Sequence, residues 1–323
     1  MKILVLGGAG YIGSCCVENL LDHGCEVVVF DSLVKGHRQA VDPRAELVEG
    51  DLADRTALDR ILSPGGFAGA IHFAAFIEAG ESMADPGRYF HNNVSCGINL
   101  LEALVAHRVP RLVFSSTAAV YGNPQQVPIT ESAPTRPINP YGESKLMFEK
   151  IMAWYHQIHD LEYVSLRYFN AAGATAEHGE DHRPESHLVP LVLQTAMGQR
   201  PEIAVFGHDY GTPDKTCIRD YIHVADLAEA HWLALQSREV GPFNLGSGSG
   251  YSVREIIEVA RQITGLSIPE RQAERRAGDP ARLISDSSRA RRILGWRPLH
   301  DNIRDIVESA WQWKQKYPEG YRD

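Results

Sequence analysis

Residues 3–13 read ILVLGGAGYIG, an apolar run that stops at three spaced glycines. The run predicts a buried strand, and the residues after it predict a helix. Such a strand–turn–helix is typical of a phosphate site, because the free N–H groups and partial positive charge of a helix N-terminus suit a pyrophosphate. We expect Gly7 to permit the tight turn, Gly10 to let the backbone approach the phosphates and Gly13 to let the helix pack on the strand.

The sequence context supports this interpretation, although the spacing is G-x-x-G-x-x-G and glycine-rich turns also arise for structural reasons alone. Residues 11–23 have helical periodicity, and residues 26–30 (EVVVF) predict a strand of the kind buried in parallel sheets. Asp31 follows that strand about 20 residues after the glycines, where a carboxylate can accept a hydrogen bond from an adenosine ribose. The alternative is that Asp31 only caps a loop.

Asp31 also bears on the choice of dinucleotide. A carboxylate at this position repels a 2′-phosphate, so the sequence favours NAD over NADP. Lys35 and Arg38 lie just beyond it and could instead hold a 2′-phosphate.

The bulk composition is that of a soluble enzyme. The chain has 323 residues, 44% of them hydrophobic and 23% charged, with a net charge of −9. The acidic balance and the lack of a basic stripe argue against nucleic acid as a partner. No apolar run reaches the ~18 residues of a membrane span, and the first residues lead into a strand, so neither a membrane anchor nor a signal peptide is expected.

The cysteines point to a reducing compartment. They show no metal-site spacing, so we expect a cytoplasmic protein with reduced, mostly packed thiols and predict no metal site. The five are Cys15, Cys16, Cys25, Cys96 and Cys217.

Strand and helix patterns alternate along the first half of the chain, which predicts an α/β fold with a doubly wound parallel sheet, the Rossmann type. Strands are expected at 46–49, 70–73, 112–115 and 163–167, and helices at 86–107 and 140–159. Ligands collect where such strands end. One crevice should therefore be bordered by Asp31, Asp51, Phe73, Ala74 and Ser115.

The regular alternation of strand and helix patterns ends after Asn170. We expect a dinucleotide-binding domain over 1–170 and a smaller α/β substrate-binding region over 171–323, some of whose segments return to the first sheet. Residues 171–186 and 207–217 are predicted loops. The elements expected here are helices at 188–198, 224–236, 252–264 and about 301–316, and a strand at 202–206.

Tyr141 and Lys145 are the candidate catalytic pair. Pro140 predicts a helix start, and residues four apart then share one face. A nearby ammonium and a positive nicotinamide ring would favour the phenolate, making Tyr141 a general base at a hydroxyl. A hydroxyl from the Ser115–Thr117 stretch, at the end of the preceding strand, can hydrogen-bond a substrate oxygen. The alternative is a plain surface pair.

These residues and several longer motifs resemble the extended short-chain dehydrogenase/reductase family, most closely its sugar-nucleotide 4-epimerases. The resemblance extends over nearly the whole chain. The motifs include VEGDL at 48–52, FSSTAAVYG at 114–122, PYGESKLMFE at 140–149, LRYFNAAGA at 166–174, RDYIHVADLA at 219–228, NLGSG at 244–248 and RRAGD at 275–279.

The resemblance implies interconversion of UDP-glucose and UDP-galactose with a tightly held NAD. Tyr141 would take the proton of the sugar 4-hydroxyl, the C4 hydride would pass to the nicotinamide, and the resulting 4-keto sugar would turn and be reduced on its other face. It also implies a homodimer that packs through 86–107 and 140–159.

The same resemblance assigns a role to individual residues. The pyrophosphate side comprises Gly7, Gly10, Tyr11, Ile12 and Gly13, the ribose side Asp31, Ser32, Leu33 and Gly36, and the adenine side Asp51 and Leu52. The nicotinamide side comprises Phe73, Ala74, Ala75, Asn92, Ser115, Tyr141 and Lys145, with Tyr168 over the ring. The substrate side comprises Thr117 and Tyr141 at the sugar, Asn170, Arg219 and Arg276 at the diphosphate, His187, Leu188, Phe206, Tyr221 and Asp279 around the uridine, and Leu283 at the closing position of the sugar pocket.

Simpler interpretations exist for two of these residues. Phe206 could be core, and Arg219 could form a structural ion pair with Asp220 or Asp226.

The chain also departs from the family pattern. Ile77 stands where one form of the family has a lysine that reaches the cofactor, and His187 replaces a usual asparagine. Thr117 replaces a serine but keeps the hydroxyl. At the sugar pocket, Leu283 is smaller than the common aromatic, so N-acetylated UDP-sugars or UDP-pentoses are alternative substrates.

Two other functions are alternatives. A sugar-nucleotide dehydratase or decarboxylase of the same fold carries an acid after the Ser-Thr pair, whereas Ala118 and Ala119 follow here. An NAD-sensing regulator would need no Tyr141–Lys145 pair.

Overall fold

The computed structural model describes residues 1–275 and 279–322. Arg276, a predicted diphosphate contact, lies outside the described residues. The larger part of the chain forms a seven-stranded sheet in the order β10-β6-β5-β4-β1-β2-β3, in which every pairing is parallel. The strands are β1 (Lys2–Leu6), β2 (Glu26–Asp31), β3 (Glu46–Glu49), β4 (Phe67–His72), β5 (Arg111–Thr117), β6 (Glu162–Tyr168) and β10 (Gly241–Leu245).

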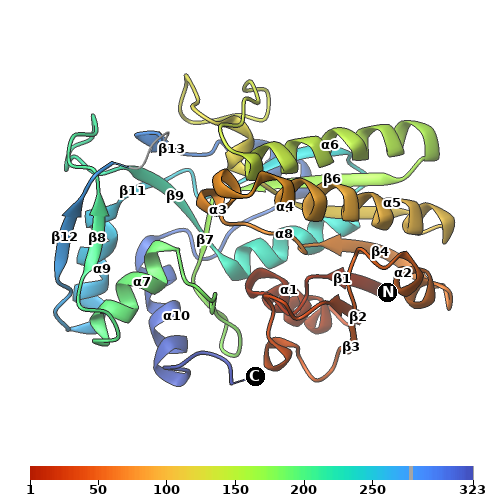
Figure 1. Cartoon of the computed structure of the whole chain (residues 1–323), viewed down its shortest axis with the longest axis horizontal. Coiled ribbons are helices and arrows are strands. Elements are labelled where there is room, and N and C mark those ends of the chain that lie inside the picture. Colours follow the sequence, from red (N-terminus) through yellow and green to blue (C-terminus); the bar gives the residue numbers. More distant parts are fainter. Residues whose placement is uncertain (276–278, 323) are drawn as a thin grey trace.

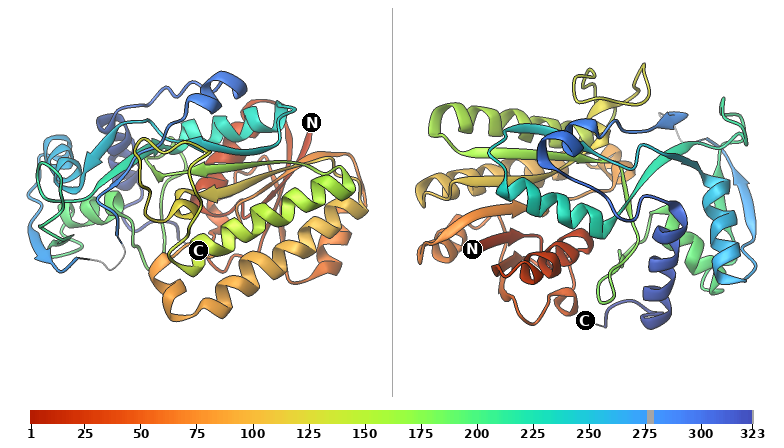
Figure 2. Two further views of the ribbon diagram at one scale, coloured as in Figure 1. Left: turned by 90° about the horizontal axis from the view of Figure 1, so that it is seen from above. Right: turned by 180° about the vertical axis from the view of Figure 1, so that it is seen from behind.

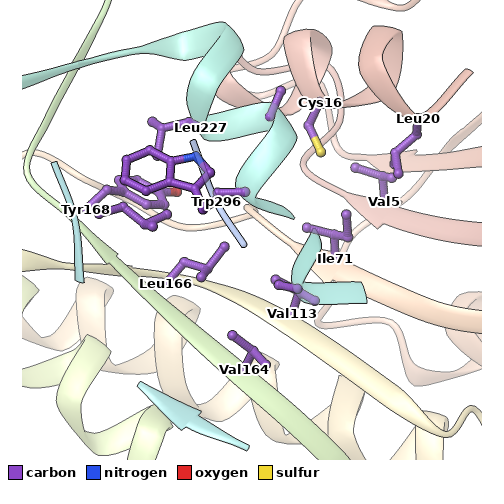
Figure 3. Packing of buried hydrophobic residues seen from close by; sticks show 14 of the residues in the cluster. Val5, Cys16, Leu20, Ile71, Val113, Val164, Leu166, Tyr168, Leu227 and Trp296 are labelled. Carbon is purple, nitrogen blue, oxygen red and sulfur yellow. The ribbon is translucent and has the colours of Figure 1, made fainter. Parts of the chain in front are cut away.

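Helices cover both faces of this sheet, as the sequence predicts for a doubly wound fold (Figures 1 and 2). The covering helices are α1 (Tyr11–Asp22), α2 (Arg55–Leu62), α5 (Cys96–Ala106), α6 (Pro140–His159) and α8 (Val224–Gln236). Alternate residues of β1 enter different cores. Ile3 and Val5 pack with α1 and α8, while Leu4 and Leu6 pack with α2, α5 and α6. Figure 3 shows the first of these cores, where Trp296 closes over Leu166 and Tyr168.

The smaller region lies at one end of the sheet (Figure 1). Its strands are β7 (Asn170–Ala172), β8 (Ile203–Phe206), β9 (Ile218–His223), β11 (Gly250–Ser252), β12 (Glu270–Ala273) and β13 (Arg282–Leu283), and its helices are α7 (Leu188–Ala196), α9 (Val253–Thr264) and α10 (Ile303–Lys316). The strands β7, β11 and β13 all pair with β9, and β8 pairs with β12. A separate apolar core joins α7, α9 and α10.

The strands of this half are where the structure differs most from the sequence prediction. Residues 170–172 and 218–223 are strands, and β10 pairs with β6 at the edge of the large sheet. β9 escapes a search for apolar runs because it carries Arg219 and Asp220, yet all six of its residues are buried. Its polar groups are matched by buried partners rather than by water.

The predicted helix over 86–107 is interrupted. The chain forms α3 (Ala79–Ala84), then α4 (Pro86–Phe90), a π-helical turn over His91–Ser95 and α5. A π turn inserts one residue without ending the helix, and this stretch has no proline or glycine, so the sequence gives no break signal there. In contrast, α6 and α8 have the predicted bounds.

No helix within residues 1–275 and 279–322 has the length and apolar character that a membrane crossing requires. The five cysteines are buried and form no disulfide, as expected for packing residues.

The glycine turn is shaped by close approach of backbone to backbone. Gly7 has a φ of +78°, and a Cβ there would lie 2.5 Å from the Ala74 nitrogen. A Cβ on Gly13 would lie 2.1 Å from the carbonyl oxygen of Gly7. By contrast, a Cβ on Gly10 meets only the Gly7 oxygen at 3.5 Å, an ordinary contact. Gly7 and Gly13 are therefore needed by the fold itself, whereas Gly10 leaves open the space in front of the helix.

We expect Gly13→Ala to destabilise the protein by about 1–3 kcal/mol, because the new methyl must push α1 off the turn after β1. A lower Tm in a thermal melt would report this. Gly211→Ala is the matched control, since a Cβ at Gly211 meets no atom within 4 Å. Equal melting temperatures for the two variants would contradict the packing role of Gly13.

Candidate active site

One cavity of about 390 Å³ opens along the carboxyl ends of the large sheet. Its wall continues across β7 to the start of α7, so both halves of the chain contribute to it. All five residues that the sequence places at one crevice line it, together with most other predicted site residues. Those that line it are Gly7, Gly10, Tyr11, Ile12, Gly13, Asp31, Ser32, Gly36, Asp51, Leu52, Phe73, Ala74, Ala75, Asn92, Ser115, Thr117, Tyr141, Tyr168, Asn170, His187, Leu188 and Tyr221.

Six predicted residues that the structure describes are not part of this wall. They are Leu33, Lys145, Phe206, Arg219, Asp279 and Leu283. Lys145 lies directly behind the wall, as shown below. The other substrate residues belong to the β8, β9 and β13 region.

The N-terminus of α1 faces the cavity without a side-chain cap. Gly10 is its N-cap residue, and no side chain accepts from the first turn. The Tyr11 hydroxyl instead donates to the Gly173 carbonyl oxygen at 2.6 Å, which fixes the helix start against the strand β7 region. Uncapped N–H groups beside a cavity can receive an anion.

Asp31 connects the end of β2 to the glycine turn. One carboxylate oxygen accepts from the Ala9 N–H and the other from the Leu33 N–H, each at 2.9 Å. Burial raises the pKa of Asp31, and these two N–H donors act against that rise. Asp31 therefore does cap this loop, as the alternative interpretation predicts. This role does not exclude a ribose contact, because Asp31 also lines the cavity.

The two cations near Asp31 both have acidic partners. Lys35 lies 3.5 Å from Glu78, and Arg38 lies 2.5 Å from Glu49. Recruiting either of them to a 2′-phosphate would require breaking an existing ion pair.

Tyr141 stands in the first turn of α6, facing the cavity. Its helix begins with Asn139, whose side chain accepts from the Gly142 N–H, and with Pro140 at the first position. The Thr117 hydroxyl, at the end of β5, lies close enough to the Tyr141 phenol to lower its pKa. Strand end and helix start therefore bring together the two hydroxyl groups that the sequence predicted.

Lys145 is buried beneath this pair and is 2% exposed, so the surface-pair interpretation is wrong. Its ammonium donates to the Ser115 carbonyl oxygen at 2.8 Å and lies 4.7 Å from the centre of the Phe114 ring. The Ser115 hydroxyl is in turn hydrogen-bonded to the Tyr168 hydroxyl.

The electrostatics of the pair differ from the sequence prediction. Burial raises the pKa of Tyr141, Glu78 raises it further, and only the Thr117 hydroxyl lowers it. Burial lowers the pKa of Lys145 to about 7, against an opposite effect of Glu149. The predicted help from Lys145 to the phenolate is not found among the described residues, because the ammonium is directed at the Ser115 carbonyl.

A buried ion pair supports the floor of the site. Glu149, one turn after Lys145, lies 2.5 Å from the Arg167 guanidinium, and their side chains are 7% and 6% exposed. The Ser116 hydroxyl donates to Glu149, and Arg167 donates to the Tyr121 hydroxyl at 3.0 Å. These bonds join α6, β5 and β6 directly below the catalytic pair.

The predicted diphosphate and uridine residues contact each other. Arg219 forms an ion pair with Asp279, not with Asp220 or Asp226, so that alternative is wrong. Asp279 also accepts from the Tyr210 hydroxyl at 3.2 Å. Phe206 ends β8 half-buried. Leu283 packs against the small apolar cluster that contains Phe169, a residue of the cavity wall.

The sequence analysis missed a polar cluster on the wall opposite the sheet. Glu180, His182, Glu185 and His187 converge just before α7. Burial alone would raise the pKa of Glu180, but the two imidazoles hold it at about 2. Burial alone would lower the pKa of His187, but Glu180 and Glu185 raise it to about 10. The pattern E-x-H-x-x-E-x-H was the available signal, and a search for cysteine pairs passes over it.

Comparison with known proteins gives one consistent result. The model of the NAD dependent epimerase/dehydratase family matches residues 3–246. A UDP-glucose 4-epimerase from Lacticaseibacillus casei is 52% identical over 329 residues, covering 100% of this chain and 99% of the relative.

Two solved structures are also similar over nearly their full length. A UDP-glucose 4-epimerase crystal structure has a TM-score of 0.98 and 49% identity, covering 100% of both chains. One from Bifidobacterium longum, in complex with NAD⁺ and UDP, has a TM-score of 0.94 and 37% identity, covering 99% of this chain and 100% of that one.

We expect Glu149→Gln to destabilise the protein by about 3–5 kcal/mol, because Arg167 would remain buried without its charge partner. A thermal melt measures the effect. The control is Glu49→Gln, which removes the partner of Arg38 where both side chains are 59% exposed and should cost about 0–1 kcal/mol. Equal melting temperatures for the two variants would show that the buried pair does not stabilise the protein more than the exposed pair does.

Proposed function

The chain belongs to the NAD dependent epimerase/dehydratase family, and we propose from this premise that it is an isomerase that interconverts UDP-glucose and UDP-galactose at carbon 4 with NAD. The observation that carries the proposal is the hydroxyl pair of Tyr141 and Thr117 above the buried Lys145, on the wall of a cavity that also contains the glycine turn and Asp31.

The described residues fit NAD at one end of this cavity. An uncapped helix N-terminus with an open Gly10 suits a pyrophosphate, and Asp31 stands at the strand end that suits a ribose. Lys35 and Arg38 are already paired with Glu78 and Glu49, and binding a 2′-phosphate would mean breaking one of these pairs. The Asp31 carboxylate would also repel such a phosphate, and both features favour NAD over NADP. We assign the cofactor side to the residues named in the sequence analysis, including Leu33 through its N–H bond to Asp31.

The chain's own residues can move one proton to and from the sugar. Tyr141 takes the proton of the 4-hydroxyl, and the Thr117 hydroxyl beside the phenol orients it. NAD, when bound beside these residues, would supply the hydride acceptor and donor that oxidation and reduction at carbon 4 require. Tyr141 then gives its proton back to the new 4-hydroxyl.

Tyr141 needs added positive charge to act as this base. In the described residues burial and Glu78 keep its pKa high. A cationic ring bound beside the phenol would lower that pKa, as would movement of the Lys145 ammonium away from the Ser115 carbonyl. Proton abstraction is thereby restricted to the complex in which the oxidised cofactor is present.

Substrate binding is assigned to the far end of the cavity. Asn170, which hydrogen-bonds Tyr221, lies beside His187 and Leu188 on the wall. Arg219 and Asp279 belong to the same substrate region but are engaged with each other. We propose that the substrate diphosphate competes with Asp279 for the Arg219 guanidinium, since an arginine fork suits phosphate oxygens.

The sugar selectivity of the site is open to larger or smaller UDP-sugars. Ile77 lines the cavity and offers no polar contact, and Leu283, which packs behind the wall against the cluster that contains Phe169, is smaller than an aromatic ring. N-acetylated UDP-hexosamines and UDP-pentoses are therefore proposed as secondary substrates.

A homodimer is proposed through α5 and α6, which lie side by side at one surface (Figure 2, left). Met147, Trp154 and Ile158 are exposed on α6 by 36%, 61% and 65%. Their spacing places them along one stripe of the helix, and such an apolar stripe is typical of an interface. The five cysteines, Cys15 and Cys16 adjacent among them, form no disulfide and suit a reducing compartment, so we propose a cytoplasmic enzyme.

The test is turnover without added cofactor. Purified protein is incubated with UDP-galactose, and UDP-glucose is measured by NMR alongside a panel of UDP-sugars. Appearance of UDP-glucose supports the proposal. Loss of water or CO₂ from the sugar nucleotide would identify a dehydratase or decarboxylase instead, although Ala118 and Ala119 have no proton to give. No conversion of any sugar by protein that retains NAD would favour an NAD-sensing regulator.

We expect Tyr141→Phe to lose roughly 10²–10⁴ in kcat while it retains bound NAD, because only the proton acceptor is removed. Turnover is measured with UDP-galactose, and the cofactor is measured in extracts of the purified protein. Turnover near that of the wild type would show that another group is the base.

We expect Asp31→Ala to change the NAD-to-NADP preference by roughly tenfold or more, because a charged hydrogen-bond partner of the ribose contributes about 1.5–3 kcal/mol. Loss of the Ala9 and Leu33 bonds weakens both cofactors alike, so the ratio of their affinities is the informative measurement. Finding NADP in wild-type extracts, or an unchanged ratio in the variant, would rule out this role.

A further inference from the structure

Four side chains in the eight residues before α7 gather around one point. Glu180, His182, Glu185 and His187 each offer a ligand atom, and these atoms lie within 4.8 Å of one another. The proposed function uses only His187 of these four, on the uridine side of the substrate, and gives no role to the acid–imidazole cluster as a whole.

The four acid–imidazole separations, which run from 2.8 to 3.8 Å, bracket the edges of a small metal tetrahedron. With zinc–ligand bonds of 2.0–2.2 Å, neighbouring ligand atoms stand about 3.3–3.6 Å apart. The Glu180 carboxylate oxygen Oε1 lies 2.8 Å from His187 Nδ1 and 3.2 Å from His182 Nδ1. Glu185 lies 3.2 Å from His187 Nδ1 and 3.8 Å from His182 Nδ1. Each carboxylate thus lies near both imidazoles, and each imidazole presents its Nδ1 atom to the carboxylates.

One imidazole nitrogen of the cluster lacks a hydrogen-bond partner among the described residues, which favours a shared ligand over simple pairing. His182 Nδ1 is buried and has no hydrogen-bond partner of acceptable geometry, although Glu180 is only 3.2 Å away. This nitrogen is therefore available as a ligand atom for an ion shared by the four groups.

Charge balance leads to the same conclusion. The side chains of Glu180 and Glu185 are 7% and 6% exposed, so two carboxylates are buried a few ångströms apart. One divalent cation held among the four groups would neutralise both carboxylates. His187 is 43% exposed, which leaves a path by which an ion can enter.

We propose that Glu180, His182, Glu185 and His187 form a structural zinc site. Two imidazoles and two carboxylates suit Zn²⁺ better than Mg²⁺ or Ca²⁺, which take oxygen ligands. Four protein ligands complete a tetrahedron and leave no position for substrate, so the role is structural. This replaces the expectation that the chain has no metal site.

The zinc site fixes the wall of the cavity on the side of the smaller region. Glu180, His182 and His187 all line the cavity, and Leu188 at the start of α7 follows directly. Glu185 additionally accepts from the His187 N–H at 2.8 Å, which ties the metal ligands to the first turn of α7. Metal binding therefore holds the long segment between β7 and α7 in place.

The experiment measures metal content and melting temperature, neither of which depends on turnover. Tag-free, full-length protein is grown with Zn²⁺ in the medium and analysed by inductively coupled plasma mass spectrometry. We expect about one zinc ion per chain in the wild type and in the control His208→Gln, whose histidine lies on an exposed loop. His182→Gln should hold little or none.

Chelation of the wild type supplies a second measurement that needs no variant. Removing the metal should lower the Tm, adding Zn²⁺ should restore it and adding Mg²⁺ should not. Co²⁺ in its place should give the strong visible absorption of a tetrahedral ion. Metal-free wild type that takes up no Zn²⁺, equal zinc content in His182→Gln, or a Tm insensitive to chelation would each show that the cluster is an ion-pair network only.

Discussion

Parallel pairing of the large sheet is the constraint on which the site depends. Because every strand runs in the same direction, the ends of β1, β2, β4, β5 and β6 meet at one edge, and the cavity follows that edge. Gly7, Asp31 and Tyr168 are far apart in sequence but line the same cavity for this reason. The buried cores on both faces hold the strand ends rigidly, which a hydride-transfer geometry requires.

The same burial sets the chemistry of the site. Removing water raises the pKa of Tyr141 and lowers that of Lys145, so each group prefers its neutral form. A neutral phenol is a poor base, and the site becomes reactive only when further positive charge is brought in. In the proposed mechanism, burial of the Tyr141 phenol would link its basicity to the redox state of the bound cofactor.

The sequence was sufficient for the first half of the chain because local signals and tertiary structure agree there. Pro140 and the apolar faces set the bounds of α6 and α8, and the glycines mark the turn. The second half was less predictable because its strands contain charges that are satisfied only in three dimensions. Asp220 in β9 accepts from Ser247 and Ser285, residues that nothing in a single sequence connects to it.

The candidate site could be predicted to a similar extent. Helical spacing indicated that Tyr141 and Lys145 share a face, but not that Lys145 would be buried and bonded to the Ser115 carbonyl. The predicted partner of Arg219 was wrong because the real partner, Asp279, is 60 residues away. The acids that the prediction considered were sequence neighbours of Arg219. The assigned roles of the individual site residues in binding stay predictions.

The two halves of the cavity wall are stabilised by different interactions. The cofactor side rests on a hydrogen-bonded sheet, whereas the substrate side rests on loops that are tied by buried acids. Asp226 accepts from the Leu299 and His300 N–H groups, and Asp181 accepts from the Tyr321 N–H. Each such carboxylate anchors a distant segment without fixing its sequence. Loops of this kind can change length and side chains while the sheet stays intact, so substrate range can vary with the cofactor chemistry unchanged.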